Sequence, residues 1–198
     1  AGVTRVFHLA AQAGVRKSWG DDFRAYTSHN IDATQRLLEA VKGRPIDRLV
    51  YASSSSVYGD VATIPFRETA YLQPVSPYGV TKLAAEHLCV LYHVNYGVPT
   101  VSLRFFTVYG PRQRPDMAFH RFIRAALLGE AITLYGDGEQ SRDFTFVGDI
   151  VAAMMAAGDR GRPGGVYNVG GGSRVTIIHE LDMIGRPTGP TLTITRLP

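Results

Sequence analysis

Tyr78 and Lys82 stand four residues apart in the segment SPYGVTK. If this segment is helical, the spacing places both side chains on one face. An ammonium group held near a phenol stabilises the phenolate. A phenol activated in this way can remove a proton from an alcohol while a hydride leaves the same carbon. The same spacing often occurs by chance, so the prediction depends on the elements that position the pair.

The helix that carries the pair is the clearest element in the sequence. We expect it over Ser76–Gly97, because Ser76 can cap it, Pro77 suits its first position and Gly97 can end it. A second group of polar residues lies earlier in the chain.

The serine run Ser53–Ser56 follows the apolar residues Leu49–Ala52 directly. A serine run is often a flexible loop, but this one ends a predicted strand, Asp47–Ser55. Hydroxyl groups at the C-terminal end of a parallel strand face the crevice in which such sheets bind ligands. We therefore expect the serines and the Tyr78–Lys82 pair to serve one site.

The remaining pattern predicts an α/β fold. Near-continuous apolar strands alternate with amphipathic helices, which indicates a parallel sheet covered on both faces. After about Phe106 the elements become shorter and turns denser, which suggests a second lobe. Besides the elements above, we expect strands at Val3–Ala11, Val98–Phe106, Ala131–Gly136 and Gly165–Gly170, and helices at about Phe23–Val41, Met117–Leu128 and Gly148–Ala157.

Composition excludes several classes of function. The 198 residues carry a formal charge of +4, spread along the chain without the dense basic stripe of a nucleic-acid-binding protein. No long apolar run or signal peptide is present, so we expect no membrane association. The single cysteine, Cys89, excludes an internal disulfide and suits the reducing cytoplasm. No cluster has metal-ligand spacing, and we expect His8 to be a core histidine with satisfied hydrogen bonds.

Six sequence blocks carry a family resemblance. In order they are FHLAAQAGV, YASSSSVYGD, SPYGVTK, RFFTVYGPRQRPDMA, YGDGEQSRDFTFVGDI and VYNVGGGS. Together they resemble the NAD-dependent epimerase/dehydratase family of extended short-chain dehydrogenases. The resemblance implies a Rossmann-like NAD-binding domain with flanking helices in residues 1–106. It also implies that residues 107–198 form mainly a small substrate-binding lobe, with late elements returning to the sheet.

The glycine-rich turn that opens such a sheet is not in this sequence. A glycine-rich turn followed by a helix N-terminus normally holds the cofactor's pyrophosphate. Gly170–Gly172 follow a late strand, so we expect a turn there. We expect a partial chain in which the first β-α units are missing.

The resemblance also implies roles for individual residues. Ser54, Tyr78 and Lys82 match the catalytic serine, the tyrosine base and its lysine, which also binds the nicotinamide ribose. The positions that match NAD contacts are Ala10, Ala11, Asn30, Ser53, Phe105 and Val108. Several of these would be ordinary core residues in any such sheet, so their assignment rests on the resemblance.

The residues around the catalytic serine favour epimerisation. Dehydratases of the family place an Asp-Glu pair where Ser55 and Ser56 stand, and the decarboxylases typically show a glutamate nearby. The segment FFTVYGPRQRPDMAF is most similar to that of UDP-glucuronate 4-epimerases, whereas galactose epimerases usually carry asparagine at the position of Thr107. Because hydroxyl groups rotate, Ser55, Ser56 and Thr107 can bind a sugar carboxylate in either of two orientations.

Three residues of the second lobe are candidates for the nucleotide end of the substrate. Arg142 and Arg114 can pair with the diphosphate, and Tyr135 can stack on the uracil. The alternatives are surface arginines and a core tyrosine. We expect Asp143 and Asp149 to fix turns or cap a helix.

The sequence therefore predicts an NAD-dependent C4 epimerase that interconverts UDP-glucuronate and UDP-galacturonate. One alternative is a 4-epimerase of a neutral UDP-hexose or a UDP-N-acetylhexosamine. An alternative of another class is a non-catalytic nucleotide-binding module, which the missing glycine turn favours and the Tyr78–Lys82 pair disfavours. We expect a cytoplasmic homodimer whose subunits pair through the helices near Phe23–Val41 and Tyr78–Gly97.

Overall fold

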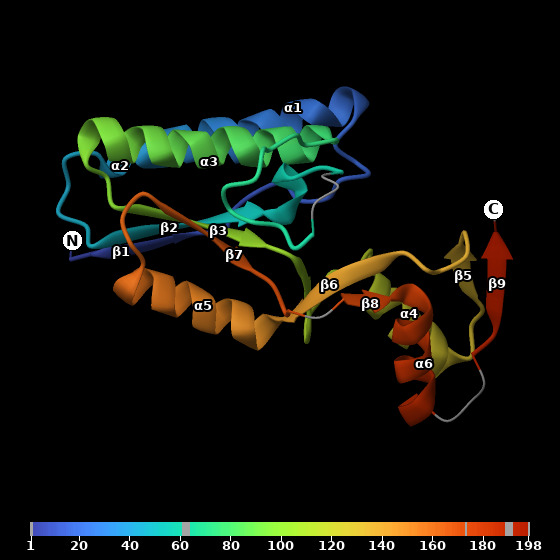
Figure 1. The fold of residues 1–198 in the computed structure, drawn as a ribbon. Coiled ribbons are helices and arrows are strands. Elements are labelled where there is room, and N and C mark those ends of the chain that lie inside the picture. The colour runs from blue at the N-terminus through green and yellow to red at the C-terminus, as the bar shows by residue number, and fades with distance from the viewer. Residues whose placement is uncertain (1, 61–63, 173, 189–191, 198) are drawn as a thin grey trace. The chain divides into compact units, whose positions relative to one another are not determined.

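Four parallel strands form the sheet that carries the candidate site (Figure 1). Their order is β1-β2-β3-β7, and they span Arg5–His8, Arg48–Ser54, Thr100–Phe105 and Gly165–Val169. The computed structural model describes residues 2–60, 64–172, 174–188 and 192–197. Residues 1–106 and 150–169 make up one compact unit, and residues 107–149 and 170–198 make up a second. The predicted α/β class with a parallel sheet is confirmed.

Helices cover both faces of this sheet (Figure 1). The helix expected at Phe23–Val41 consists of three consecutive segments, preceded by a short helical turn, η1. On the same face lies the 20-residue helix α3, while α5 packs on the other face, where Gly158 lies against Phe7. The bounds are η1 Gly20–Asp22, α1 Phe23–Tyr26, η2 Thr27–Asp32, α2 Ala33–Val41, α3 Pro77–Tyr96 and α5 Val147–Arg160.

The ends of α3 confirm the predicted caps. The Ser76 hydroxyl accepts a hydrogen bond of 3.1 Å from the Gly79 amide, and Pro77 is the first helical residue. Gly97 ends the helix with φ of 68°, the left-handed conformation that favours glycine. These local signals fix where the helix begins, and hence which residues face the sheet.

The core of the first unit lies between α2, α3 and the sheet. Burial of these apolar side chains is the main driving force that holds α3 on β2 and β3. The cluster consists of Leu38, Val41, Leu49, Tyr51, Ala85, Cys89, Tyr92 and Val98.

The second unit is built from short elements. Strands β4, β6 and β8 form one sheet, β5 and β9 pair in another, and α4 packs with α6. The strands β4, β6, β8 and β9 and the helix α6 were not expected from the sequence. The bounds are β4 Thr107–Tyr109, α4 Ala118–Leu128, β5 Ile132–Tyr135, β6 Ser141–Phe146, β8 Arg174–Thr176, α6 Ile177–Thr188 and β9 Ile194–Leu197. Among the described helices, none has the length and apolar character needed to cross a membrane.

Candidate active site

Ser54 is the last residue of β2 and caps the helical turn η3 (Ser55–Val57) that follows. Its hydroxyl oxygen accepts a hydrogen bond of 3.2 Å from the Ser56 amide. The hydroxyl proton therefore stays available for donation. Ser55 and Ser56 lie in η3 and are half-buried. The serine run thus lies at the carboxyl end of a parallel strand, as expected, and its last two residues begin a capped helical turn that was not predicted.

Gly79 lets α3 approach this turn closely. A Cβ atom at this position would lie 2.6 Å from the Ser56 carbonyl oxygen and 2.9 Å from Cβ of Pro74. Any larger residue would push the helix and the serine turn apart. The glycine next to Tyr78 therefore brings the tyrosine's helix against the turn that Ser54 caps.

The ring of Tyr78 is half-buried and packs against Tyr26. The ring centroids lie 6.2 Å apart in an edge-to-face arrangement with an interplanar angle of 78°. The Tyr26 hydroxyl donates hydrogen bonds to the carbonyl oxygens of Gly14, at 2.7 Å, and Ala13, at 3.2 Å. Tyr26 thus fixes the segment after β1 beside Tyr78.

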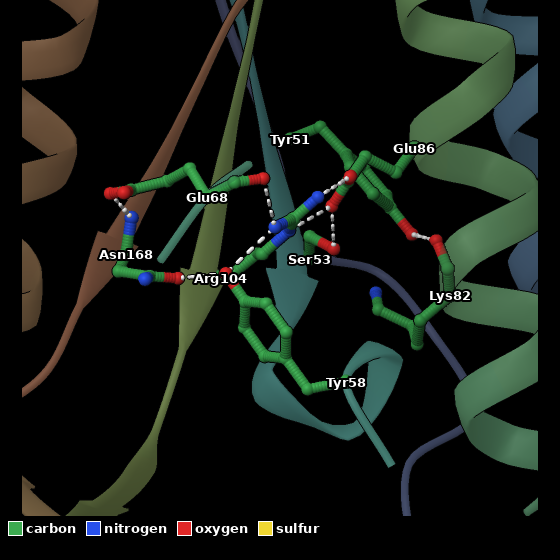
Figure 2. A network of polar contacts seen from close by, with 8 residues as sticks. All are labelled: Tyr51, Ser53, Tyr58, Glu68, Lys82, Glu86, Arg104 and Asn168. Atoms are coloured by element: carbon green, nitrogen blue, oxygen red, sulfur yellow. Dashed lines mark hydrogen bonds and ion pairs between the residues drawn. The ribbon is translucent and has the colours of Figure 1, made fainter. Parts of the chain in front are cut away.

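Lys82 lies one helical turn further on and is 3% exposed. Its ammonium nitrogen lies 4.6 Å from the centre of the Tyr51 ring, a cation–π contact (Figure 2). Burial lowers the pKa of Lys82 to about 8, and the neighbouring Cys89 and Glu86 act in the opposite direction. The protonated form therefore predominates at neutral pH, as stabilisation of a Tyr78 phenolate requires.

Asn30 connects the segment after β1 to α3. Its side-chain oxygen accepts from the Gln12 amide at 2.7 Å, and its amide nitrogen donates to the Gln12 carbonyl at 3.1 Å and the Thr81 hydroxyl at 2.9 Å. The Thr81 hydroxyl in turn donates to the Tyr78 carbonyl at 2.8 Å. Asn30 is 1% exposed and sits in the π-helical segment η2. Such segments are frequent at functional sites.

His8 is a core histidine with a satisfied hydrogen bond, as expected. Its Nε2 lies 2.9 Å from the Thr34 hydroxyl oxygen, and that hydroxyl donates to the Asn30 carbonyl at 2.7 Å. Because the Thr34 proton is used, Nε2 of His8 is the donor. Burial, and secondarily Lys82, lowers the pKa of His8 and favours this neutral form.

The residues matched to cofactor contacts in the first unit lie in the segment after β1 and at the carboxyl ends of β2 and β3. Ala10 and Ala11 are exposed in the segment after β1, and Phe105 is paired in register with Ser54. Ser53 is 3% exposed and its hydroxyl donates to Glu86, at 2.6 Å. Contact of these residues with NAD stays a prediction.

The second unit carries the other predicted residues. Thr107 and Val108 are half-buried in β4, paired in register with β6. Arg114 is exposed and donates to the carboxylate of Asp116 at 3.0 and 2.8 Å. Arg142 is exposed on β6, where it donates to the Ser141 carbonyl, and Tyr135 is 54% exposed. Tyr135 is therefore a surface residue of its unit and not a core tyrosine.

Asp143 fixes a turn, as predicted. Its carboxylate accepts hydrogen bonds from the amides of Gly171, at 2.6 Å, and Gly172, at 3.2 Å. The triple glycine is thus a turn held by a side chain of its own unit.

Within the part of the chain that the structure describes, no group of three or more His, Cys, Asp or Glu side chains can hold a metal ion.

Several residues around the site were not anticipated: Gln12, Tyr26, Thr81, Glu86 and Arg104. Two of them carried a signal. Glu86 follows Lys82 by the same four-residue spacing that singled out Lys82, and Arg104 is a lone charge in the apolar run VSLRFF. The other three are ordinary residues whose role depends on contacts between distant segments.

Known proteins of similar sequence and structure place the chain in a family. A Bacillus subtilis protein described as an uncharacterized UDP-glucose epimerase, YtcB, is 49% identical over 196 residues, which are 98% of this chain and 61% of that protein. The UDP-glucuronate 4-epimerase of Thermodesulfobacterium geofontis is 41% identical over 182 residues, covering 90% of this chain and 55% of the enzyme.

Among solved structures, the UDP-glucuronic acid 4-epimerase of Bacillus cereus in complex with UDP-glucuronic acid and NAD is similar with a TM-score of 0.93. It is 46% identical, and the match covers 98% of this chain and 62% of that one. The chain thus spans about six-tenths of the length of these relatives. The model of the NAD dependent epimerase/dehydratase family matches residues 1–170. The chain belongs to the NAD-dependent epimerase/dehydratase family.

Proposed function

We propose that the whole protein catalyses NAD-dependent epimerisation at C4 of a UDP-sugar and that it interconverts UDP-glucuronate and UDP-galacturonate. The observation that carries this proposal is the close approach of two elements within one unit. The serine turn at the end of β2 packs against the first turn of α3, next to Tyr78 and above the buried Lys82. The relatives that act on UDP-glucuronate support the choice of substrate.

The residues present fit a bound dinucleotide. In the described residues, Lys82 is a buried cation without an ion-pair partner. It lies near the carboxyl ends of the parallel strands, where such folds bind nucleotides. An ammonium in this position can donate to the hydroxyls of a ribose. We propose that Lys82 holds NAD together with Ala10, Ala11, Asn30, Ser53, Phe105 and Val108.

The reaction begins with proton transfer. Tyr78 takes the proton of the C4 hydroxyl, Lys82 stabilises the phenolate before the transfer, and Ser54 donates a hydrogen bond to the C4 oxygen. Bound NAD would supply the hydride chemistry, because it would take up the hydride from C4 and give it back to the opposite face of the sugar, so no external reductant would be consumed. After the 4-keto sugar has turned in the site, Tyr78 returns its proton to the C4 oxygen.

The carboxylate of the sugar needs control during this turn. The 4-keto intermediate of a uronic acid is a β-keto acid and loses carbon dioxide easily. We propose that the hydroxyls of Ser55, Ser56 and Thr107 hold the carboxylate close to the plane of the C4 carbonyl. The bond that would break is then out of line with the π system. Hydroxyls suit this task because they rotate to follow both orientations of the sugar.

The nucleotide end is assigned to the second unit. We propose that Arg114 and Arg142 pair with the diphosphate and that Tyr135 stacks on the uracil. All three side chains are exposed in this chain, which leaves them open to a ligand. Arg114 would exchange the carboxylate of Asp116 for a phosphate.

A neutral sugar is the second candidate. The relative of highest identity named above is described as a UDP-glucose epimerase. The hydroxyls of Ser55, Ser56 and Thr107 can also bind an uncharged hydroxymethyl group. Assaying UDP-glucuronate beside UDP-glucose and UDP-N-acetylglucosamine with the full-length protein separates the two, and preference for a neutral sugar would reject the uronate assignment.

Tyr78→Phe tests the chemistry itself. We expect the rate of epimerisation by the full-length protein to fall about 10²-fold or more, because the general base is lost. Tyr71→Phe is the matched control, since Tyr71 is 80% exposed. Wild-type turnover in Tyr78→Phe would reject the mechanism, and NAD binding without turnover by the wild-type protein would indicate a binding module.

We also propose that the protein is a homodimer. One side of α3 exposes apolar side chains to solvent, with Val80 46%, Leu91 53% and Val94 74% exposed. A shallow hollow there is lined by Ala84, His87, Leu88, Val90, Leu91 and Val94. A second copy of this helix is an occupant of matching apolar character. Leu91→Glu should convert the dimer to a monomer in sedimentation experiments, and a monomeric wild-type protein would refute the proposal. The cytoplasmic location stays a prediction.

A further inference from the structure

A buried network of polar side chains joins α3, the helix that carries Tyr78 and Lys82, to the sheet (Figure 2). Its centre is an ion pair between Glu86 of α3 and Arg104 of β3, with side chains that are 3% and 4% exposed. Beyond Arg104 the network continues through the Tyr58 hydroxyl, at 2.7 Å, to Asn168 of β7, also at 2.7 Å. It therefore connects α3 with the strands of the sheet.

The carboxylate of Glu86 is held by three hydrogen bonds. Arg104 approaches it as a fork, with Nη2 at 2.6 Å from one oxygen and Nε at 3.1 Å from the other. The Ser53 hydroxyl donates to the second oxygen at 2.6 Å. A buried ion pair seldom stabilises a fold more than apolar residues of the same size would. Stability alone is therefore a weak reason for this arrangement.

The network touches both parts of the catalytic site. Glu86 follows Lys82 by one helical turn and Tyr78 by two, on the same face of α3. Ser53 immediately precedes Ser54 on β2. The bond between Ser53 and Glu86 thus ties the strand that carries the catalytic serine to the helix that carries the base.

Glu86 also balances charge in the interior. The charged and titratable groups around Lys82 are His8 of β1, Tyr51 of β2, Arg104 of β3, and Tyr78, Glu86 and Cys89 of α3. Of these, only Glu86 is a carboxylic acid, and its side chain forms an ion pair with Arg104. It raises the pKa of Lys82 against the lowering effect of burial.

We infer that Glu86 is a positioning residue of the reaction. Its carboxylate fixes the catalytic serine relative to Tyr78 and supplies the counter-charge for Lys82, and the fork of Arg104 holds that carboxylate in place. The inference rests on the proposed function, in which Tyr78 and Lys82 act on the sugar. It adds a residue that touches neither substrate nor cofactor.

The first test reads the charge of Lys82 without catalysis. Lysine labelled with ¹³C at Cε reports ionisation by NMR in the full-length protein, and Lys82→Arg identifies the resonance. We expect Glu86→Gln to lower the titration midpoint of Lys82 by about one pH unit, because the counter-charge is removed. The alkaline limb of kcat/KM should move by the same amount. An unchanged Lys82 midpoint in Glu86→Gln would overturn the counter-charge role.

Asn168→Ala is the matched control. It removes the side-chain bonds to Tyr58 and to the Phe66 carbonyl at the far end of the network but leaves every partner of Glu86 in place. We expect it to lower the unfolding midpoint without moving either titration. An equal shift of the Lys82 midpoint in Asn168→Ala would show that loosening the network suffices, and would overturn the inference.

Glu86→Asp separates the two roles and serves if Glu86→Gln does not fold. It keeps the charge but shortens the side chain, so the bonds to Ser53 and Arg104 cannot all form. We expect kcat to fall about tenfold or more while the Lys82 midpoint stays near its wild-type value. Wild-type kcat in this variant would overturn the positioning role. If the wild-type protein turned over no UDP-sugar, the proposed function would be rejected instead. The NMR titration would still show whether Glu86 sets the charge of Lys82, because it does not depend on catalysis.

Discussion

Gly79→Ala perturbs the contact that joins the two halves of the catalytic site. The added Cβ would lie 2.6 Å from the Ser56 carbonyl oxygen, a backbone atom that cannot rotate away. Overpacking of this kind costs about 1–3 kcal/mol. Because alanine has a higher helix propensity than glycine, the substitution also stabilises the helix by up to about 1 kcal/mol. We therefore expect a loss of up to about 2 kcal/mol in the free energy of unfolding.

The effect on catalysis should be larger than the effect on stability. The carbonyl must retreat by several tenths of an ångström, and Ser54 caps the same turn. A displacement of about 1 Å in a catalytic group costs on the order of 10²-fold in rate. We expect kcat/KM for epimerisation to fall about tenfold to a hundredfold, measured with the full-length protein by chromatography of the sugar nucleotides.

Gly185→Ala is the matched control for this substitution. Gly185 also lies in a helix, α6, but its added Cβ would meet Leu192 at an ordinary 3.5 Å. This variant should retain full activity and be as stable as the wild type or slightly more stable. If Gly79→Ala kept wild-type kcat/KM and stability, the close approach of α3 to the serine turn would not be what positions Ser54 and Tyr78.

Three other perturbations probe separate parts of the chain. Ser56→Ala and Thr107→Ala should lower epimerisation and release a UDP-pentose detectable by chromatography, and clean epimerisation at full rate in both would contradict the carboxylate pocket. Asn30→Ala should cost about 2 kcal/mol in urea unfolding, because buried partners at Gln12 and Thr81 lose their hydrogen bonds, whereas the exposed neighbour His29→Ala should cost little. Glu180 is 0% exposed, and burial raises its pKa from 4.5 to about 7. The folded state therefore favours its protonated form, so its contribution to stability falls by about 3 kcal/mol as pH rises from 4.5 through 7. Glu180→Gln should remove that slope from a pH series of unfolding experiments, and an unchanged slope would contradict the assignment.

The elements that carry the catalytic residues could be predicted because their signals are local. Ser76, Pro77 and Gly97 specify the ends of α3 within the segment itself. An apolar run followed by serines indicated the strand β2 and the hydroxyl groups at its end. Tyr78 and Lys82 then fall on one helical face by geometry alone. For these parts the sequence contains the physical cause of the structure.

Other features depend on contacts between distant segments, so patterns within single segments did not predict them. The π-helical segment around Asn30 exists where that side chain binds Gln12 and Thr81, which lie 18 and 51 residues away. Strand β8 has only three residues, which is too short for a recognisable strand pattern, and it exists where it pairs with β6. The Glu86–Arg104 pair joins a helix to a strand that follows it. Sequence patterns describe faces of single elements, and these features arise only when elements meet.

The buried thiol of Cys89 can report how often α3 separates from the sheet. Burial raises its pKa to about 12, and the side chain is 0% exposed. At pH 8 only about one thiol in ten thousand is ionised in the closed state, so alkylation there is negligible. Labelling of Cys89 can proceed only when α3 separates from the sheet. The labelling rate therefore measures how often α3, which carries Tyr78 and Lys82, separates from the sheet. A bound cofactor that stabilises this packing should slow labelling in proportion to its occupancy.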